Sequence, residues 1–157
     1  MKKGYLYTGV FLFIAYILQD VLVLHWQYLA DLQLQESYKR WSGLALFTYI
    51  GLQWSLTLFR IKKSLEDRSA TVMSIHKWMG AFSPLIFYVH SMKFGFAYLF
   101  ILSVLFFVNV FLGFVHMDEL KAKAYWYFQG WMIAHVAFSL AVSLLAFYHI
   151  WIVFYYS

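Results

Sequence analysis

Five long apolar runs constrain the fold of this chain more than any other feature. They cover about residues 5–24, 44–59, 71–92, 96–115 and 126–155. Each is close to the roughly 20 residues that an α-helix needs to cross the hydrocarbon core of a bilayer. Only 12% of the 157 residues are charged and 64% are hydrophobic, too few polar side chains to cover a soluble domain. We therefore expect an all-α fold, a single polytopic transmembrane domain over residues 1–157 with about five helices.

The basic residues predict the direction of these helices. With a cytoplasmic N terminus, nine Lys and Arg residues fall on the inner side and three on the outer side. The inner residues are Lys2, Lys3, Arg60, Lys62, Lys63, Arg68, Lys77, Lys121 and Lys123, and the outer ones are Lys39, Arg40 and Lys93. Cytoplasmic loops of membrane proteins carry such an excess, so the net charge of +5 requires no nucleic acid. We expect an integral protein of a bacterial inner membrane, surrounded by lipid, with its C terminus on the outer side.

Four histidines form two pairs with the same spacing. His76 and His90 are fourteen positions apart, and so are His135 and His149. Fourteen residues advance a helix by about 21 Å and nearly four turns, so both imidazoles of a pair share one face. In the topology above, the third and fifth helices run in the same direction. We therefore expect His76 at the depth of His135 in the inner half, and His90 at the depth of His149 in the outer half.

Two imidazoles that face each other across a gap can be the two axial ligands of a haem iron. The residues between the histidines are mostly small and would leave room for a flat porphyrin. They are Gly80, Ser83 and Phe87 on the third helix, and Ser139, Val142 and Ala146 on the fifth. We expect Phe87 to pack between two macrocycles and Pro84 to bend the third helix around them.

Other interpretations of the histidines stay open. An intramembrane histidine is commonly a hydrogen-bonded core residue, and small residues on a helix face commonly mark close helix packing. A bound transition metal is the main rival to haem, although zinc prefers four ligands. The absence of cysteine excludes thiolate metal sites, iron–sulfur clusters and disulfides. Because ionisable groups in a membrane are rare and functional by default, two matched pairs favour two haems.

At these histidines the chain resembles the dihaem membrane b-type cytochromes. The H-x13-H pattern on two helices is similar to the haem signature of the ferric-reductase and NADPH-oxidase-like transmembrane core, and to that of the respiratory cytochrome b core. The resemblance covers roughly residues 71–155 and implies that His76, His90, His135 and His149 ligate two stacked b haems in an electron-transfer oxidoreductase. Ferric reductases continue into flavin and nicotinamide domains, whereas this sequence contains no Gly-rich nucleotide loop. We therefore expect a separate redox donor or acceptor subunit, or a quinone.

Several other polar residues lie near the expected membrane boundaries. Asp20 is a candidate proton acceptor for a quinol near the outer haem, and a hydrated helix end is the alternative. Arg60, Lys77 and Lys93 would either pair with haem propionates or extend to the lipid headgroups. We expect His25 and His116 to be mostly solvated, and Asn109 and Gln53 to make helix–helix hydrogen bonds.

Three functions therefore remain open. The leading one is transmembrane electron transfer through two bis-histidine b haems, between a quinone pool or partner redox subunit and an acceptor across the membrane. The second is a quinol-oxidising or quinone-reducing enzyme subunit that handles protons near Asp20. The third is a haem-containing membrane anchor or assembly subunit of a larger complex.

Overall fold

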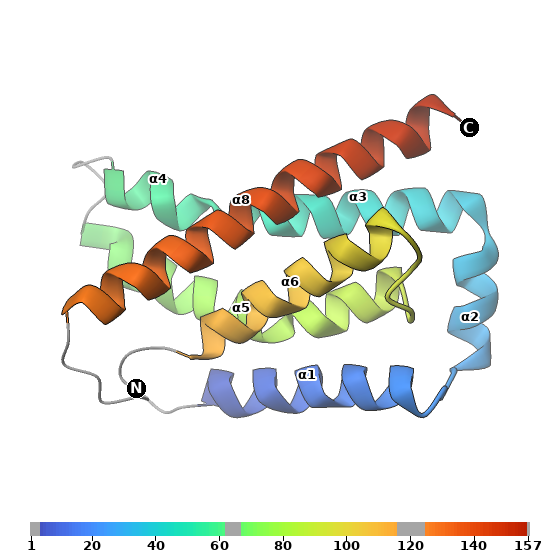
Figure 1. Cartoon of the computed structure of the whole chain (residues 1–157), viewed down its shortest axis with the longest axis horizontal. Helices are drawn as coiled ribbons and strands as arrows, with labels where there is room; N and C mark the ends of the chain where they lie inside the picture. The colour runs from blue at the N-terminus through green and yellow to red at the C-terminus, as the bar shows by residue number, and fades with distance from the viewer. Residues whose placement is uncertain (1–3, 62–66, 116–124, 157) are drawn as a thin grey trace. The chain divides into compact units, whose positions relative to one another are not determined.

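A computed structural model describes residues 4–61, 67–115 and 125–156 (Figure 1). The helices are α1 (Gly4–Val21), α2 (Gln27–Leu34), α3 (Glu36–Gln53), α4 (Ser55–Ile61), α5 (Ser69–His90), α6 (Tyr98–Phe114) and α8 (Tyr125–Tyr155). These three ranges contain no strand, so the expected all-α class is confirmed. The chain divides into an N-terminal unit, Met1–Met92, and a C-terminal unit, Lys93–Ser157, and each is described by itself.

The first helix ends at Val21, before the end of the apolar run expected over residues 5–24. The backbone turns at Val23, which has a φ of 54°. The Leu24 amide donates to the Gln19 carbonyl (2.9 Å) and the Val23 amide to the Asp20 carbonyl (3.2 Å). These two bonds form a Schellman motif, in which the left-handed position is usually Gly or Asn. A β-branched residue there is strained, so the apolar sequence gave no sign of this helix end.

The apolar run expected over residues 44–59 lies in two helices instead of one. α3 begins at Glu36, ahead of that run, and ends at Gln53, while α4 begins at Ser55. Between them, the Trp54 amide donates to the Gly51 carbonyl three residues back (3.1 Å). Such a bond belongs to the tighter 3₁₀ geometry, which ends α3 at this point.

In the N-terminal unit, α5 packs against α1 and α3 (Figure 1). α1 runs parallel to α5: Gly4 lies opposite Trp78, and Tyr16 packs edge-on against Phe87 with ring centroids 5.4 Å apart. α3 runs antiparallel to α5: Ser42, early in α3, contacts His90 at the end of α5, and Tyr49, later in α3, donates its hydroxyl to the Met79 carbonyl earlier in α5 (2.6 Å). The outward or inward direction of each helix in a membrane stays a prediction.

Pro84 interrupts the hydrogen bonds inside α5, as its lack of an N–H predicts. The carbonyl that would have accepted this bond belongs to Gly80. The Ser83 hydroxyl donates to that carbonyl instead (2.7 Å). Ser83 and Pro84 are both buried, so the side chain of Ser83 satisfies a group that the proline leaves open. This role for Ser83 was not anticipated from the sequence.

In the C-terminal unit, α6 and α8 pack antiparallel. The Asn109 amide nitrogen donates to the Ser139 hydroxyl (3.0 Å), which confirms the helix–helix bond expected of Asn109. Trp131, near the start of α8, donates its indole N–H to the carbonyl of Leu112 near the end of α6 (2.8 Å). Both Val142 and Ala146 are buried.

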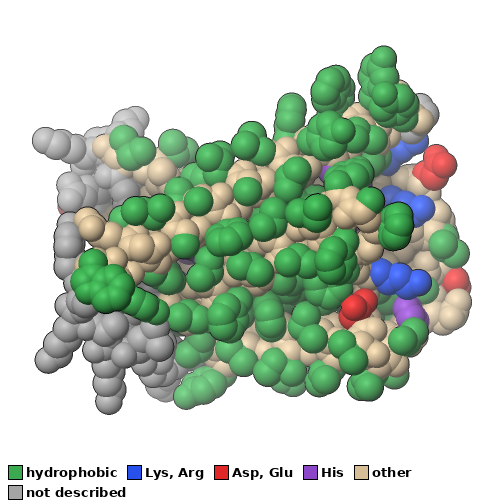
Figure 2. Space-filling view, viewed as in Figure 1, with side chains coloured by type: hydrophobic (Ala, Val, Ile, Leu, Met, Phe, Trp, Pro, Cys, Tyr) green, Lys and Arg blue, Asp and Glu red, His purple; other side chains and the backbone are tan. Residues whose placement is uncertain are grey.

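α1 and α8 are long and apolar enough to cross a membrane, by length and composition alone. α6 is apolar but shorter. Hydrophobic side chains cover most of the visible surface of the helices (Figure 2). Among them, Phe11 on α1 is 69% exposed and Leu144 on α8 is 61% exposed. Apolar side chains in such number on a surface fit a lipid environment. The complete five-helix transmembrane bundle stays a prediction.

Candidate functional site

His90, the last residue of α5, contacts the side chain of Ser42 on α3. The Ser42 hydroxyl lies 3.1 Å from His90 Nδ1 and donates to the Tyr38 carbonyl at 2.7 Å. A hydroxyl has one proton to donate, so a Ser42 that donates to the Tyr38 carbonyl would accept its second hydrogen bond from His90. In that arrangement Nδ1 would carry the imidazole proton, and the lone pair would be on Nε2.

Gly43 lets the His90 ring lie close to the backbone of α3. A Cβ atom at Gly43 would lie 3.0 Å from His90 Cε1, closer than an ordinary van der Waals contact. Any larger residue at this position would push against the ring. Ser42 thus forms the hydrogen bond with this imidazole, and the backbone at Gly43 limits how close the ring can come to α3.

Polar side chains from neighbouring helices also bind the end of α5 that carries His90. Gln33 on α2 donates to the carbonyls of Tyr88 (2.9 Å) and Val89 (3.0 Å), and its side-chain oxygen accepts from the Met92 amide (3.1 Å). The Tyr38 hydroxyl donates to the Val89 carbonyl (2.9 Å). Because the last carbonyls of a helix have no partner within it, these side chains supply bonds that would otherwise come from water.

His149 on α8 has a comparable hydroxyl contact. Its Nδ1 lies 3.2 Å from the hydroxyl of Tyr98, the first residue of α6. Both histidines of the expected outer pair therefore have a hydroxyl at Nδ1, supplied by another helix of the same unit.

His135 is oriented by ring stacking. Trp131, one turn earlier on α8, lies parallel to its imidazole, with centroids 5.8 Å apart and an interplanar angle of 3°. Gly113 on α6 faces the same ring, with His135 Cε1 3.7 Å from the position of an added Cβ. The hydroxyl of Ser139 donates to the His135 carbonyl (2.8 Å) and so binds the backbone of the histidine.

His76 is half-buried on α5, one turn before Gly80. No atom of the described residues outside the local helix lies within 4 Å of a Cβ added at Gly80, so this part of the face is open. The ring of Phe87 packs against Tyr16 on α1, and its placement between two macrocycles stays a prediction. The pairing of the α5 histidines with those of α8 joins the two units and also stays a prediction.

The other predicted site residues lie apart from these imidazoles. Lys77 places its ammonium 5.2 Å from the centroid of the Tyr5 ring, in a cation–π contact. Lys93 is exposed between α5 and α6, and the side chain of Arg60 lies outside the described part of α4. His116 lies outside the described residues as well. Contacts of the basic residues with haem propionates stay predictions.

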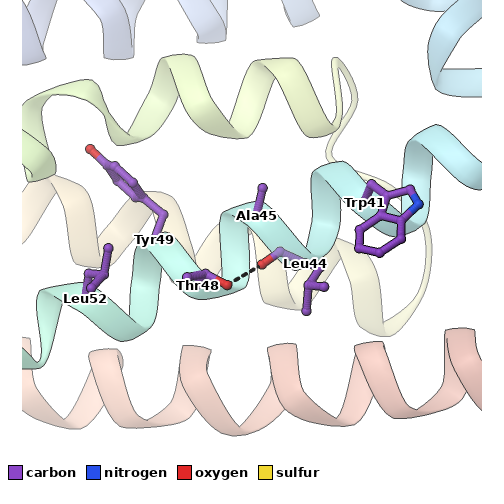
Figure 3. Close-up of a pocket in the computed structure, with 6 residues that line it drawn as sticks. All are labelled: Trp41, Leu44, Ala45, Thr48, Tyr49 and Leu52. Atoms are coloured by element: carbon purple, nitrogen blue, oxygen red, sulfur yellow. Dashed lines mark hydrogen bonds between the residues drawn. The ribbon is translucent and has the colours of Figure 1, made fainter.

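An open groove follows one face of α3 (Figure 3). Its lining residues are Trp41, Leu44, Ala45, Thr48, Tyr49 and Leu52. The two hydroxyls in this set already donate to backbone carbonyls, Thr48 to Leu44 (2.9 Å) and Tyr49 to Met79 (2.6 Å). No imidazole lines the groove, so it is separate from the histidine sites.

Within the described ranges, no three His, Asp or Glu side chains lie close enough together to bind a metal ion. No protein-family model, curated protein or solved structure matches this chain. The resemblance to dihaem b-type cytochromes therefore depends on the histidine pattern itself.

Proposed function

We propose that this protein is a membrane b-type cytochrome that carries electrons between a quinone pool or partner redox subunit and an acceptor across the membrane. His76 and His135 would ligate an inner haem, and His90 and His149 an outer haem. Haem, when bound, supplies the one-electron carrier. The chain supplies the ligands, fixes their orientation and keeps water away. The observation that carries this proposal is the identical spacing of the two histidine pairs on α5 and α8.

The hydroxyl contacts of the outer histidines support it. A histidine that ligates a metal through one nitrogen usually donates the N–H of the other to a nearby acceptor, which fixes its tautomer. Ser42 is such an acceptor at Nδ1 of His90, and the Tyr98 oxygen is placed to be one at Nδ1 of His149. Both rings would then offer Nε2 to iron.

The two histidines of the C-terminal unit contact opposite ends of α6. His90 ends α5, and Tyr98, which contacts His149, begins α6, so seven residues (91–97) separate them in sequence. His135 instead contacts the far end of α6, at Gly113. The proposed outer ligand His149 and the proposed inner ligand His135 therefore lie at opposite ends of α6 within the C-terminal unit.

The purified chain is expected to contain two low-spin b haems, because four imidazoles fill the axial positions of two irons. Haem is quantified by pyridine haemochrome against protein concentration, and its spin state is read from reduced-minus-oxidised spectra. One haem per chain, or a high-spin spectrum, would contradict the assignment of two bis-histidine pairs.

A quinone-reactive enzyme subunit is the second candidate, and the surroundings of Asp20 favour it. Gln19, the preceding residue, donates its amide to the carbonyl of Met92 (2.7 Å), two residues after His90. Asp20 is half-buried in the last turn of α1, so its backbone lies at the level of the outer ligand on α5. A carboxylate at that level could accept the proton that a quinol releases with each electron.

Asp20→Asn is expected to slow quinol-driven haem reduction at least about tenfold, because general acid–base catalysis usually contributes roughly 100-fold or more. Asparagine keeps the shape of the side chain but does not accept the proton, so haem content should stay unchanged. The rate is followed by stopped-flow absorbance with a short-chain quinol. Asp31→Asn, on exposed α2, is the matched control. If Asp20→Asn reduces its haem at the same rate as the parent protein, Asp20 does not handle protons. The protein would then carry electrons only.

A further inference from the structure

We infer that Ser42 and Gly43 on α3 are positioning residues for His90, which hold its imidazole in the Nδ1–H tautomer and direct Nε2 toward the outer haem. The tautomer and the ring position follow from contacts within the N-terminal unit. The role toward haem rests on the proposed function. Neither residue belongs to the ligand pattern, and both act through the imidazole they contact.

The inferred tautomer of His90 depends on the direction of the Ser42 hydrogen bond. The Ser42 hydroxyl donates to the Tyr38 carbonyl at 2.7 Å and approaches the Lys39 carbonyl at 3.3 Å. A serine inside a helix commonly donates to the carbonyl of the preceding turn in this way. For His90 Nδ1 to accept instead of donate, Ser42 would have to give up both carbonyls. Ser42 therefore selects the tautomer in which Nε2 has the lone pair that a metal needs.

The inferred position of the His90 ring depends on its close approach to Gly43. A hydrogen bond to Nδ1 restricts the rotation of the imidazole, and the backbone at Gly43 limits how far the ring can tilt toward α3. The 3.0 Å distance from the added Cβ to His90 Cε1 means that an alanine would displace the ring. Gly51 lies on the same helix, where an added Cβ meets no atom within 4 Å. The chain thus contains its own control for the effect of alanine on α3.

The first test uses electron paramagnetic resonance of the oxidised full-length protein. In low-spin ferric haem with two imidazole ligands, the relative orientation of the ring planes sets the g values. Gly43→Ala is expected to shift the signal of one haem and leave the other unchanged, whereas Gly51→Ala shifts neither. If Gly43→Ala leaves both signals at their parental values, Gly43 does not position the ligand.

The second test removes the hydroxyl. Ser42→Ala is expected to release one haem about tenfold faster to an apomyoglobin acceptor, the low end of the range for a lost partner of a metal-bound histidine. Ser42→Thr keeps a hydroxyl and should restore the parental rate. Equal release rates for Ser42→Ala and the parent would overturn the role of Ser42. If Gly43→Ala does not fold, these two serine variants decide the inference.

A third readout needs no haem and separates the inference from the proposed function. Full-length protein lacking haem is labelled with ¹⁵N in its imidazoles and studied by NMR at about pH 8.5, where imidazole is ordinarily neutral. His90 is expected to show the Nδ1–H tautomer, and Ser42→Ala to shift it toward Nε2–H. If this holds but no haem binds, the proposed function fails and the tautomer assignment stands. If two haems bind but His90 is Nε2–H in the haem-free protein, the inference fails and the proposed function stands.

Discussion

His76→Ala and His135→Ala are each expected to eliminate one and the same haem, while His90→Ala and His149→Ala eliminate the other. An alanine offers no axial ligand, and an iron left with one imidazole loses the low-spin bis-histidine spectrum, so each variant is scored by its low-spin haem. Double variants make the pairing measurable. His76→Ala with His135→Ala should retain one haem per chain, whereas His76→Ala with His149→Ala should retain none. Both are read as the amount of low-spin haem per protein chain.

The double variants also test whether the histidine partners are exchanged. If the variant that combines His76→Ala with His149→Ala keeps one haem, the partners are exchanged and α5 and α8 run antiparallel. His25→Ala serves as the control, because His25 is exposed and its Nδ1 lies 2.9 Å from the Val23 carbonyl two residues away, apart from the four candidate ligands. It should retain both haems.

The helical class could be predicted from the sequence because it depends on local composition. The apolar run expected over residues 71–92 became α5, Ser69–His90, and the run over 126–155 lies within α8, Tyr125–Tyr155. The errors occurred where tertiary or backbone geometry decides. Val23 ends α1 in a left-handed turn that favours glycine. α3 begins at Glu36, eight residues before the apolar run expected from residue 44. These first residues are mostly polar, so a hydrophobic pattern does not show that they are helical.

The four histidines were visible in the sequence because each pair belongs to one helix, where spacing alone determines which residues share a face. The residues that orient them were not visible. Ser42 is 48 positions from His90, and Tyr98 is 51 positions from His149. Serine and tyrosine are common residue types in any helix, so their importance depends on which helices pack together. Gly43 gave no signal either, because only the close imidazole distinguishes it from Gly51.

The hydrogen bonds of the residues expected between the histidine ligands could not be predicted from the sequence either. Ser83 was expected to line a gap for porphyrin, yet its hydroxyl replaces the N–H that Pro84 lacks. Spacing on a helix identifies the face on which a side chain lies, but the hydrogen bond that the side chain makes depends on local backbone geometry. For Ser83, the neighbouring proline determined that bond.

Gln33→Ala is expected to destabilise the folded protein by about 2 kcal/mol, roughly thirtyfold in the unfolding equilibrium, because it removes three hydrogen bonds worth about 0.5–1.5 kcal/mol each. The Met92 amide loses its acceptor, and the carbonyls of Tyr88 and Val89 lose a donor. Met92 is 3% exposed, so water cannot readily replace the bond to its amide. The end of α5 that carries His90 should then fray before the rest of the helix.

Thermal unfolding in detergent measures the stability, and hydrogen exchange of the amides at the end of α5 measures the local opening. Gln27→Ala is the matched control on the same helix. Gln27 is exposed and donates only to Asp31 one turn later (2.9 Å), so its loss should change stability by no more than about 0.5 kcal/mol. If both variants melt alike, Gln33 does not anchor α5. The position of His90 would then depend on the contacts with α1 and α3 alone, and Ser42→Ala combined with Gln33→Ala should destabilise the protein no more than Ser42→Ala by itself.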